Sequence, residues 1–349
     1  MTEATAPAPP AQQAPTGLTR QLGLLGLAAT GICSMMGAAI NVIPIMIQRN
    51  VPGIGAWVLP AYLFAAAPAV LAALAYAVLA SAMPRAGGSY IYASRGLSPY
   101  LGFVASFSQW FGLSIAIGVV SYVLIPFIRD VVGAVGMDGL AATLDVGWVR
   151  VSLALAFLWG SAALNLVGLR LYERILVPLM FLMFILGGVV IVAGFLYDHG
   201  DFAAALLAAE GVAVPEAEAA RPSLGTFLAA SAVLFSSFIG FDSIAQAGGE
   251  ARDAHRALPR AIGIAVITVG SFYFLFTAAV YHAVPWQFVA ERAQTQDLTA
   301  PGLLGYLLSP GWTVLIVAGA AVALANDLPA MLLAVSRLMF AWAEDGIFP

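Results

Sequence analysis

Eight long apolar segments, separated by shorter polar stretches, dominate the hydrophobic pattern of the chain. They are Leu22–Ile47, Trp57–Ala82, Leu101–Ile128, Val149–Val167, Ile175–Tyr197, Leu224–Ala247, Ala261–Ala283 and Trp312–Ala341. A helix of about 20 residues crosses the hydrocarbon core of a bilayer. The pattern therefore predicts an all-α polytopic membrane protein with eight spans.

Two of these segments carry glycine and polar residues near the middle. Residues 31–44 read GICSMMGAAINVIP, and residues 235–249 read FSSFIGFDSIAQAGG, with the acid Asp242 near the centre. Glycine inside a helix is less favourable than alanine by about 1 kcal/mol, and every backbone group inside a bilayer needs a partner. We therefore predict that both helices are broken, and broken helices in membranes line cavities and binding sites.

The two interrupted segments lie more than two hundred residues apart, as the first helices of two repeated halves would. We expect a transmembrane domain over residues 21–349, with a first repeat over 21–197 and an incomplete second repeat over 223–349. Residues 1–17 are rich in proline, alanine and glutamine and lack the apolar core of a signal peptide. We expect residues 1–20 to form a disordered cytoplasmic tail.

The composition fits a membrane protein and excludes other classes. Hydrophobic residues make up 62% of the 349 and charged residues only 9%, against about 25% charged in soluble domains. All fourteen basic residues are arginines, and they form no basic patch of the kind that binds nucleic acid. The single cysteine, Cys33, cannot form an internal disulfide, so we expect it to be a packing residue.

The arginines also predict the orientation, because cytoplasmic loops of membrane proteins are enriched in positive residues. With the N-terminus inside, the cytoplasmic segments hold Arg20, Arg85, Arg95, Arg170, Arg174, Arg252, Arg256, Arg260 and Arg337. The opposite side then holds Arg49, Arg129, Arg150, Arg221 and Arg292. Nine against five predicts a multi-pass protein of the cell membrane with a cytoplasmic N-terminus.

Two acids, Asp242 and Asp327, lie well inside apolar segments. An aspartate at the centre of an inserted helix costs about 2.5–3.5 kcal/mol, so such residues usually face a cavity and mark ion or substrate paths. Asn326 precedes Asp327, and Pro329 frees a backbone carbonyl one turn earlier, which together offer oxygen ligands to a hard cation. Asp242, Asn326 and Asp327 are thus candidates for coupling to H⁺ or Na⁺. The alternatives are a buried structural acid in each case and a simple proline kink near Pro329.

Four stretches carry a family resemblance. They are residues 31–44 (GICSMMGAAINVIP), 84–103 (PRAGGSYIYASRGLSPYLGF), 238–262 (FIGFDSIAQAGGEARDAHRALPRAI) and 336–349 (SRLMFAWAEDGIFP). In this order and spacing they resemble the amino acid–polyamine–organocation superfamily of permeases: its broken first helix, its first cytoplasmic loop, its sixth helix with the following loop, and the end of its eighth helix.

The resemblance implies a five-plus-five inverted repeat, in which the unwound parts of helices 1 and 6 hold an amino acid or small amine at mid-membrane. A half-helix N-terminus offers N–H groups to a carboxylate, and exposed carbonyls receive an ammonium. By residue matching, the carboxylate would meet the backbone of Gly37, Ala38, Ala39 and Ile40. The amino group would meet the carbonyls of Met35, Ser236 and Ile239. Gly240 is the central glycine of the second break. Two aromatic residues are candidate walls or gates, or else packing residues: Phe241 and Trp110.

The chain departs from the family pattern at several points. Ala38 and Ala39 replace a small residue followed by glycine, which counts against a standard α-amino acid as substrate. Ser236 stands where some antiporters carry a gating aromatic, which implies a wider cavity. The fifth helix lacks the lysine that proton-coupled members often use, so coupling, if it exists, runs through Asp242 or Asp327 or neither. Members of the family usually have more than eight spans, so we expect a chain truncated after helix 8, either a fragment or a shortened relative.

The leading hypothesis is a secondary transporter of an amino acid or small amine in the lipid bilayer, ion-coupled or exchanging, without a cofactor and of unpredicted oligomeric state. The alternative is a non-transporting sensor or assembly subunit on a degenerate or truncated permease fold. A membrane-embedded enzyme is disfavoured, because the chain has no HExxH or Gly-x-Ser-x-Gly motif and its three histidines are scattered. An ion channel is disfavoured because no selectivity-filter sequence is visible.

Overall fold

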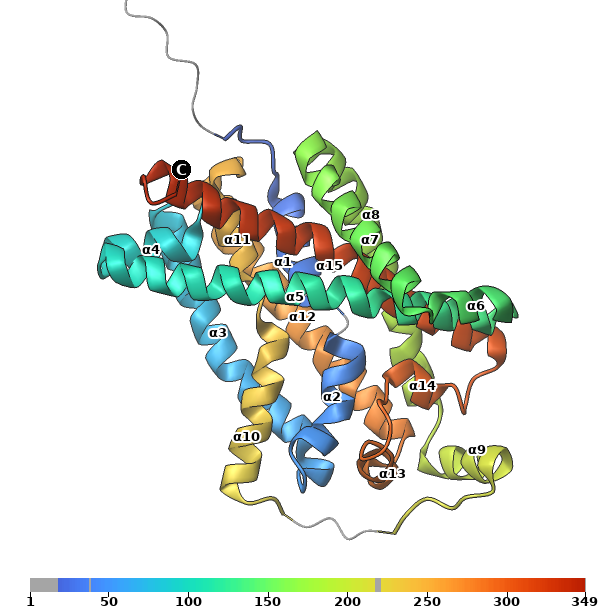
Figure 1. Cartoon of the computed structure of the whole chain (residues 1–349). Coiled ribbons are helices and arrows are strands. Elements are labelled where there is room, and N and C mark those ends of the chain that lie inside the picture. The colour runs from blue at the N-terminus through green and yellow to red at the C-terminus, as the bar shows by residue number, and fades with distance from the viewer. Residues whose placement is uncertain (1–17, 38, 217–220, 349) are drawn as a thin grey trace, which may run out of the picture.

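The computed structural model of the chain describes residues 18–37, 39–216 and 221–348, and within them the fold is all-α (Figure 1). Eight segments of these residues are long and apolar enough to cross a membrane, as the sequence predicts. They are α1 with α2 (Leu24–Met35, Ala39–Asn50), α3 (Val58–Ala82), α5 (Pro99–Ala134), α7 (Gly147–Val167), α8 (Leu169–Leu196), α10 with η2, α11 and η3 (Leu224–Phe235, Ser236–Phe238, Asp242–Gln246, Ala247–Glu250), α12 (Ala254–Ala283) and α15 (Pro310–Glu344). Shorter helices connect them: η1 (Gly55–Trp57), α4 (Gly88–Gly96), α6 (Asp138–Leu144), α9 (His199–Glu210), α13 (Trp286–Arg292) and α14 (Ala300–Leu304).

Several spanning helices begin earlier than their apolar segments. Helix α5 begins at Pro99, where the Ser98 hydroxyl caps it by accepting a hydrogen bond of 3.2 Å from the Leu101 N–H. Helix α8 begins at Leu169, and its first two turns carry the exposed charges of Arg170 and Arg174. The apolar pattern marks only the part of a helix that lies in hydrocarbon, so it misses polar turns at the membrane surface.

The first span is broken where the sequence predicts. Helix α1 ends at Met35 and α2 begins at Ala39, and Met36 and Gly37 between them are not helical. Residue Ala38 lies outside the described residues. The Met36 N–H still closes the last turn of α1 by donating 2.8 Å to the Ile32 carbonyl, so the helix ends in an ordered way.

The sixth span is also broken at its central glycine. After α10 and the single turn η2, Ile239 is extended (φ −68°, ψ 134°) and Gly240 takes φ 129°, before α11 begins at Asp242. A φ of 129° is readily open to glycine alone. A side chain at Gly240 would also overlap the Ser34 backbone, so the two breaks are in direct contact.

Helix α1 lies at the centre of the molecule, where it contacts α8, α11, α12 and α15. Every residue from Gly26 to Met35 is buried, and small residues permit this close packing: a Cβ at Gly31 would overlap Ile244 of α11. Around this centre, α3 packs along α12 and α5 packs along α15, and the two pairs cross one another in Figure 1. The packing therefore places both breaks in the middle of the bundle.

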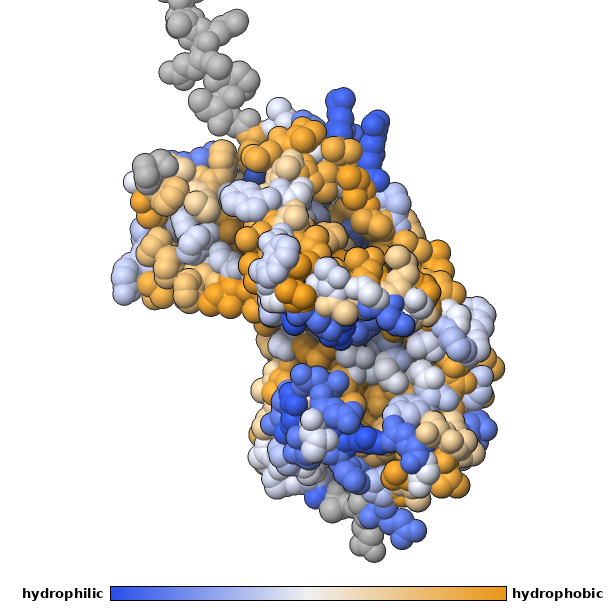
Figure 2. Space-filling model, turned by 45° about the vertical axis from the view of Figure 1, so that its right-hand side comes forward, coloured by the Kyte–Doolittle hydropathy of each residue, from blue (hydrophilic) through white to orange (hydrophobic). Residues whose placement is uncertain are grey.

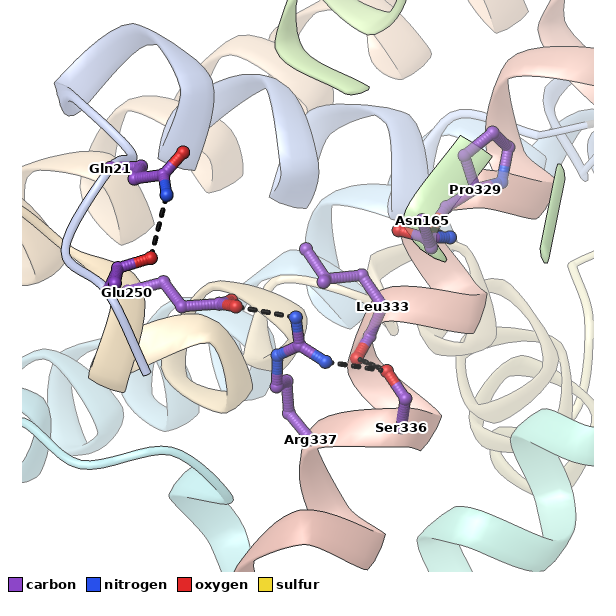
Figure 3. A network of polar contacts seen from close by, with 8 residues as sticks. Gln21, Asn165, Glu250, Pro329, Leu333, Ser336 and Arg337 are labelled. Atoms are coloured by element: carbon purple, nitrogen blue, oxygen red, sulfur yellow. Dashed lines mark hydrogen bonds and ion pairs between the residues drawn. The ribbon is translucent and has the colours of Figure 1, made fainter. Parts of the chain in front are cut away.

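The end of the sixth span is tied to both the N-terminal segment and α15 (Figure 3). The Glu250 carbonyl accepts hydrogen bonds of 2.9 Å from the N–H groups of Gln21 and Leu22, and the Arg252 N–H donates 2.8 Å to the Leu22 carbonyl. The Glu250 carboxylate pairs with the Arg337 guanidinium. Of the predicted cytoplasmic tail, only residues 18–20 are described, and they are irregular.

Apolar side chains cover much of the face seen in Figure 2. Among the most exposed are Leu71 and Val78 of α3, Trp159 of α7 and Ile185 of α8. A soluble protein rarely leaves so many large apolar residues in water, whereas a bilayer solvates them. The surface thus agrees with the membrane location that the hydropathy predicts.

Candidate functional site

A cavity of about 460 Å³ lies between the two breaks, α5 and α15. Six predicted site residues line it: Met35, Gly37, Ser236, Ile239, Asp242 and Asp327. A larger groove of about 630 Å³ between α8 and the start of α15 contains no residue of either break. The smaller cavity is the candidate site, because backbone groups freed by both breaks and two intramembrane acids meet there.

Asp242 is held in place by the second break and by α5. Its Oδ1 accepts a hydrogen bond of 3.1 Å from the Gly240 N–H, and its Oδ2 accepts one from the side-chain amide of Gln109. The Gln109 Oε1 accepts 3.1 Å from the Gln246 amide, which also donates 2.8 Å to the Ser89 hydroxyl. The half-buried Asp242 carboxylate is therefore fixed by neutral donors, and no arginine pairs with it among the described residues.

Asp327 lies on α15 and reaches the first break. Its side chain is 3% exposed, and its carboxylate lies so close to Gly37 that a Cβ there would overlap Oδ2. The Oδ1 atom has no hydrogen-bond partner among the described residues, and no ion pair with Asp327 is present there either. This buried carboxylate therefore faces the cavity without a protein partner in the described part of the chain.

Asn326 points away from Asp327, although the two are adjacent in sequence. Its amide donates 3.0 Å to the Cys33 Sγ and 3.4 Å to the Leu176 carbonyl, between α1 and α8. Consecutive residues on a helix are about 100° apart around the axis, so Asn326 points between α1 and α8 while Asp327 faces the cavity. Of the predicted oxygen ligands, the structure thus places the Asp327 carboxylate at the cavity and the Asn326 side chain away from it. Cys33 is buried as expected.

The residues predicted to bind substrate through their backbone do not all lie at the cavity. The Met35 carbonyl accepts a hydrogen bond of 2.5 Å from the Tyr273 hydroxyl of α12, so one of its two acceptor positions is occupied. Gly240 packs on α1 rather than lining the cavity, and Ile40 is buried beside a separate small cavity behind the break. The side chain of Ala39 is not described, and Ala38 lies outside the described residues.

The two candidate aromatic walls are packing residues in this structure. Phe241 is buried and meets the Tyr76 ring edge-on, with ring centroids 5.5 Å apart. Trp110 packs against Phe107 and Trp342, with centroid distances of 5.7 and 5.9 Å. Neither ring lines the cavity, which agrees with the packing alternative that the sequence left open.

Two contributors to the site were not singled out in the sequence. Gln109 of α5 orients Asp242, and the Ser34 hydroxyl of α1 bonds the Ser243 hydroxyl of α11 at 2.7 Å. Gln109 had a usable signal, since an amide inside an apolar span is uncommon and marks a polar partner or a path. Ser34 had none, because serines in helices commonly bond their own backbone.

A family model described as amino acid permease matches residues 22–349 of the chain. The chain belongs to the amino acid permease family. It is thereby a member of the amino acid–polyamine–organocation superfamily, in agreement with the resemblance of the four motifs.

This permease is similar to several curated proteins. It is 26% identical over 291 residues to the low-affinity putrescine importer PlaP of Escherichia coli K12, a match that covers 83% of this chain and 60% of that protein. It is 27% identical over 353 residues to cationic amino acid transporter 4 of Mus musculus, with 95% and 51% covered. The vacuolar cationic amino acid transporter 4 of Arabidopsis thaliana is 27% identical over 347 residues, with 96% and 54% covered. The permease chain thus spans little more than half the length of these relatives.

Proposed function

We propose that this permease is a secondary transporter that moves a small amine or amino acid across the cell membrane through the cavity between its two breaks. The observation that carries the proposal is the meeting of both breaks and two acids at one cavity of about 460 Å³. Freed backbone groups and acids inside a membrane bind polar solutes that the hydrocarbon would otherwise exclude. The names of the relatives, an importer of putrescine and transporters of cationic amino acids, support an amine or amino acid as substrate.

The proposed architecture is an inverted repeat of residues 21–197 and 223–349. Elements in equivalent positions of the two halves contact one another: the two breaks, α3 with α12, and α5 with α15. Such pairing supports a pseudo-symmetric pair of halves between which the site forms. In this proposal the N-terminus is cytoplasmic, as the arginine distribution favours.

The proposed coupling runs through Asp242 or Asp327, each able to take a proton or help hold Na⁺. Both carboxylates line the cavity, so the protonation or ion occupancy of either one changes the field at the substrate. Asn326 is a weaker candidate, because its amide contacts Cys33 and Leu176 instead.

The test is uptake into liposomes that contain the purified chain. A panel of labelled amines and amino acids is offered with and without a proton or Na⁺ gradient, and gradient-driven uptake of at least one compound is expected. Binding without flux in correctly folded protein would instead support the sensor or assembly-subunit alternative.

A matched pair of α5 variants tests the cavity itself. Gly112 lines the cavity and Gly118 does not, and at both positions an added Cβ would meet no protein atom within 4 Å. We expect Gly112→Val to reduce uptake at least tenfold and Gly118→Val to leave it unchanged. Equal uptake by both variants would place the transport path elsewhere.

A further inference from the structure

A second pocket, of about 410 Å³, lies at the surface between the starts of α1 and α8. Its lining combines Leu25 of α1 with five residues of α8: Arg170, Glu173, Arg174, Val177 and Pro178. The two helices are close there, because a Cβ at Gly26 would overlap the Glu173 carboxylate. Among the described residues, this α1–α8 pocket shares no lining residue with the cavity between the breaks.

The two arginines of the α1–α8 pocket have no acidic partner. Arg170 and Arg174 are exposed, and neither forms an ion pair within the described part of the chain. Glu173 between them is turned toward Gly26 of α1. Residues four apart on a helix share a face, so both guanidinium groups can reach one anion. Arginine donates in a planar fork that matches the oxygens of a phosphate group.

The face of α8 that carries these arginines becomes apolar along the helix. Arg170, Arg174, Pro178, Leu182 and Ile185 follow the helical repeat, and all five are exposed. From residue 174 to residue 185 the helix rises about 16 Å, close to half of a hydrocarbon core of about 30 Å. A phospholipid has the same profile, with a phosphate at the membrane surface and acyl chains below it. This continuity favours a lipid over a free phosphate ion.

The charge of the lining favours an anionic lipid. Two arginines and one glutamate give a formal charge of about +1, which one phosphodiester group neutralises. A zwitterionic headgroup adds a cationic group that the two arginines repel. In the orientation that we propose, this end of α8 is cytoplasmic, and the cytoplasmic leaflet is the one that carries anionic lipids.

We propose that the α1–α8 pocket binds one anionic glycerophospholipid, with its phosphate between Arg170 and Arg174 and an acyl chain along the exposed face of α8. Because Leu25 also lines the pocket, the bound lipid contacts the start of the first broken span as well as α8. The proposal goes beyond the proposed transport function, since lipid binding at this pocket does not require flux through the cavity.

Native mass spectrometry of the purified full chain in detergent tests the lipid class. The probes are phosphatidylglycerol, phosphatidylcholine and phosphatidylethanolamine with identical acyl chains. We expect phosphatidylglycerol to bind at least tenfold more tightly than the other two, and an excess of soluble glycerol 3-phosphate to leave it bound. Equal or tighter binding of a zwitterionic lipid, or displacement by glycerol 3-phosphate, would overturn the proposal.

A matched pair of double variants tests the location. Arg170→Gln with Arg174→Gln should weaken phosphatidylglycerol at least tenfold and remove its advantage over phosphatidylcholine. Arg256 and Arg260 of α12 are exposed, have the same spacing and lie outside the pocket. Arg256→Gln with Arg260→Gln should therefore leave the binding unchanged. Equal losses in the two double variants would show general attraction to positive charge and would contradict a site at α8.

A gain of binding provides a test that misfolding cannot imitate. Glu173→Gln removes the only acid of the described pocket lining and keeps the size of the side chain. It should bind phosphatidylglycerol at least threefold more tightly, because the phosphate then meets no like charge. Unchanged or weaker binding by Glu173→Gln would count against a phosphate held in this pocket.

Discussion

The Arg337 guanidinium donates a hydrogen bond of 2.5 Å to the Glu250 carboxylate, and this ion pair fastens the end of the sixth span to the eighth (Figure 3). The side chains are only 17% and 3% exposed. The same Glu250 holds the N-terminal segment through its backbone carbonyl. One residue thus joins three parts of the chain on the side that the arginines predict to be cytoplasmic.

Breaking this pair is expected to destabilise the protein strongly. Glu250→Gln or Arg337→Gln should each lower the free energy of unfolding by about 3–5 kcal/mol, because either change leaves a buried charge without its partner. Chemical unfolding in detergent, followed by tryptophan fluorescence, measures the effect. Arg95→Gln is the matched control: it removes the more exposed pair with Asp345 and should cost less than about 1 kcal/mol. Equal losses in the two positions would contradict the structural role of Glu250.

Replacing Gly240 is expected to disrupt the contact between the two breaks. Gly240→Ala imposes a strained backbone at φ 129°, which costs about 1–3 kcal/mol, and its Cβ also overlaps the Ser34 backbone. The variant should unfold at lower denaturant and lose substrate binding together. Gly263→Ala on α12, where a Cβ meets nothing within 4 Å, should lose neither. Normal binding by Gly240→Ala would show that the breaks need not touch.

The start of α9 offers a pH-dependent signal outside the membrane. The Asp198 carboxylate accepts hydrogen bonds from the N–H groups of Asp201 and Gly200, which lower its pKa. A group with a lowered folded-state pKa stabilises the fold above its unfolded value, and that contribution is lost as pH falls through the folded value. The protection of the Gly200 and Asp201 amide hydrogens from exchange, relative to an unstructured peptide at the same pH, should therefore fall below the ordinary aspartate range.

Substitutions at Asp198 separate the cap from its charge. Asp198→Asn keeps a good helix cap without a titrating group, so amide protection should persist and lose its pH dependence. Asp198→Ala should lose the protection at every pH. Protection that still falls with pH in Asp198→Asn would assign the effect to another acid.

Run length and composition were enough to predict the spans and both breaks. A membrane leaves few alternatives to a long apolar helix, and Gly240 with its polar neighbours marks a place where such a helix cannot continue. The cavity positions Met35, Gly37, Ser236 and Ile239 were predicted from the resemblance to the permease family, by matching residues to its motif, and these four residues line the cavity.

Side-chain direction could not be predicted in the same way. Asn326 and Asp327 are neighbours, yet only the rotation of α15 against α1 and α8 decides which of them faces the cavity. Gln109 meets Asp242 across 133 residues of sequence, and no local pattern encodes that contact. The sequence alone does not distinguish a gating role from a packing role for Trp110 and Phe241, because the distinction depends on the neighbouring rings in the folded structure.

The contact between the two breaks joins residues that the ribosome synthesises far apart in time. The hydrogen-bond partner of the Ser34 hydroxyl, Ser243, is synthesised 209 residues later. The partner of the Met35 carbonyl, Tyr273, is synthesised 238 residues later. At about 5–20 residues per second, a ribosome takes roughly 10 to 50 s to supply them. Throughout that interval the first span has a broken helix without its final partners in hydrocarbon, where unpaired polar groups are costly. The unpaired polar groups of the first span therefore need protection from lipid by the insertion machinery while the chain is nascent, and no longer need it once the permease has folded.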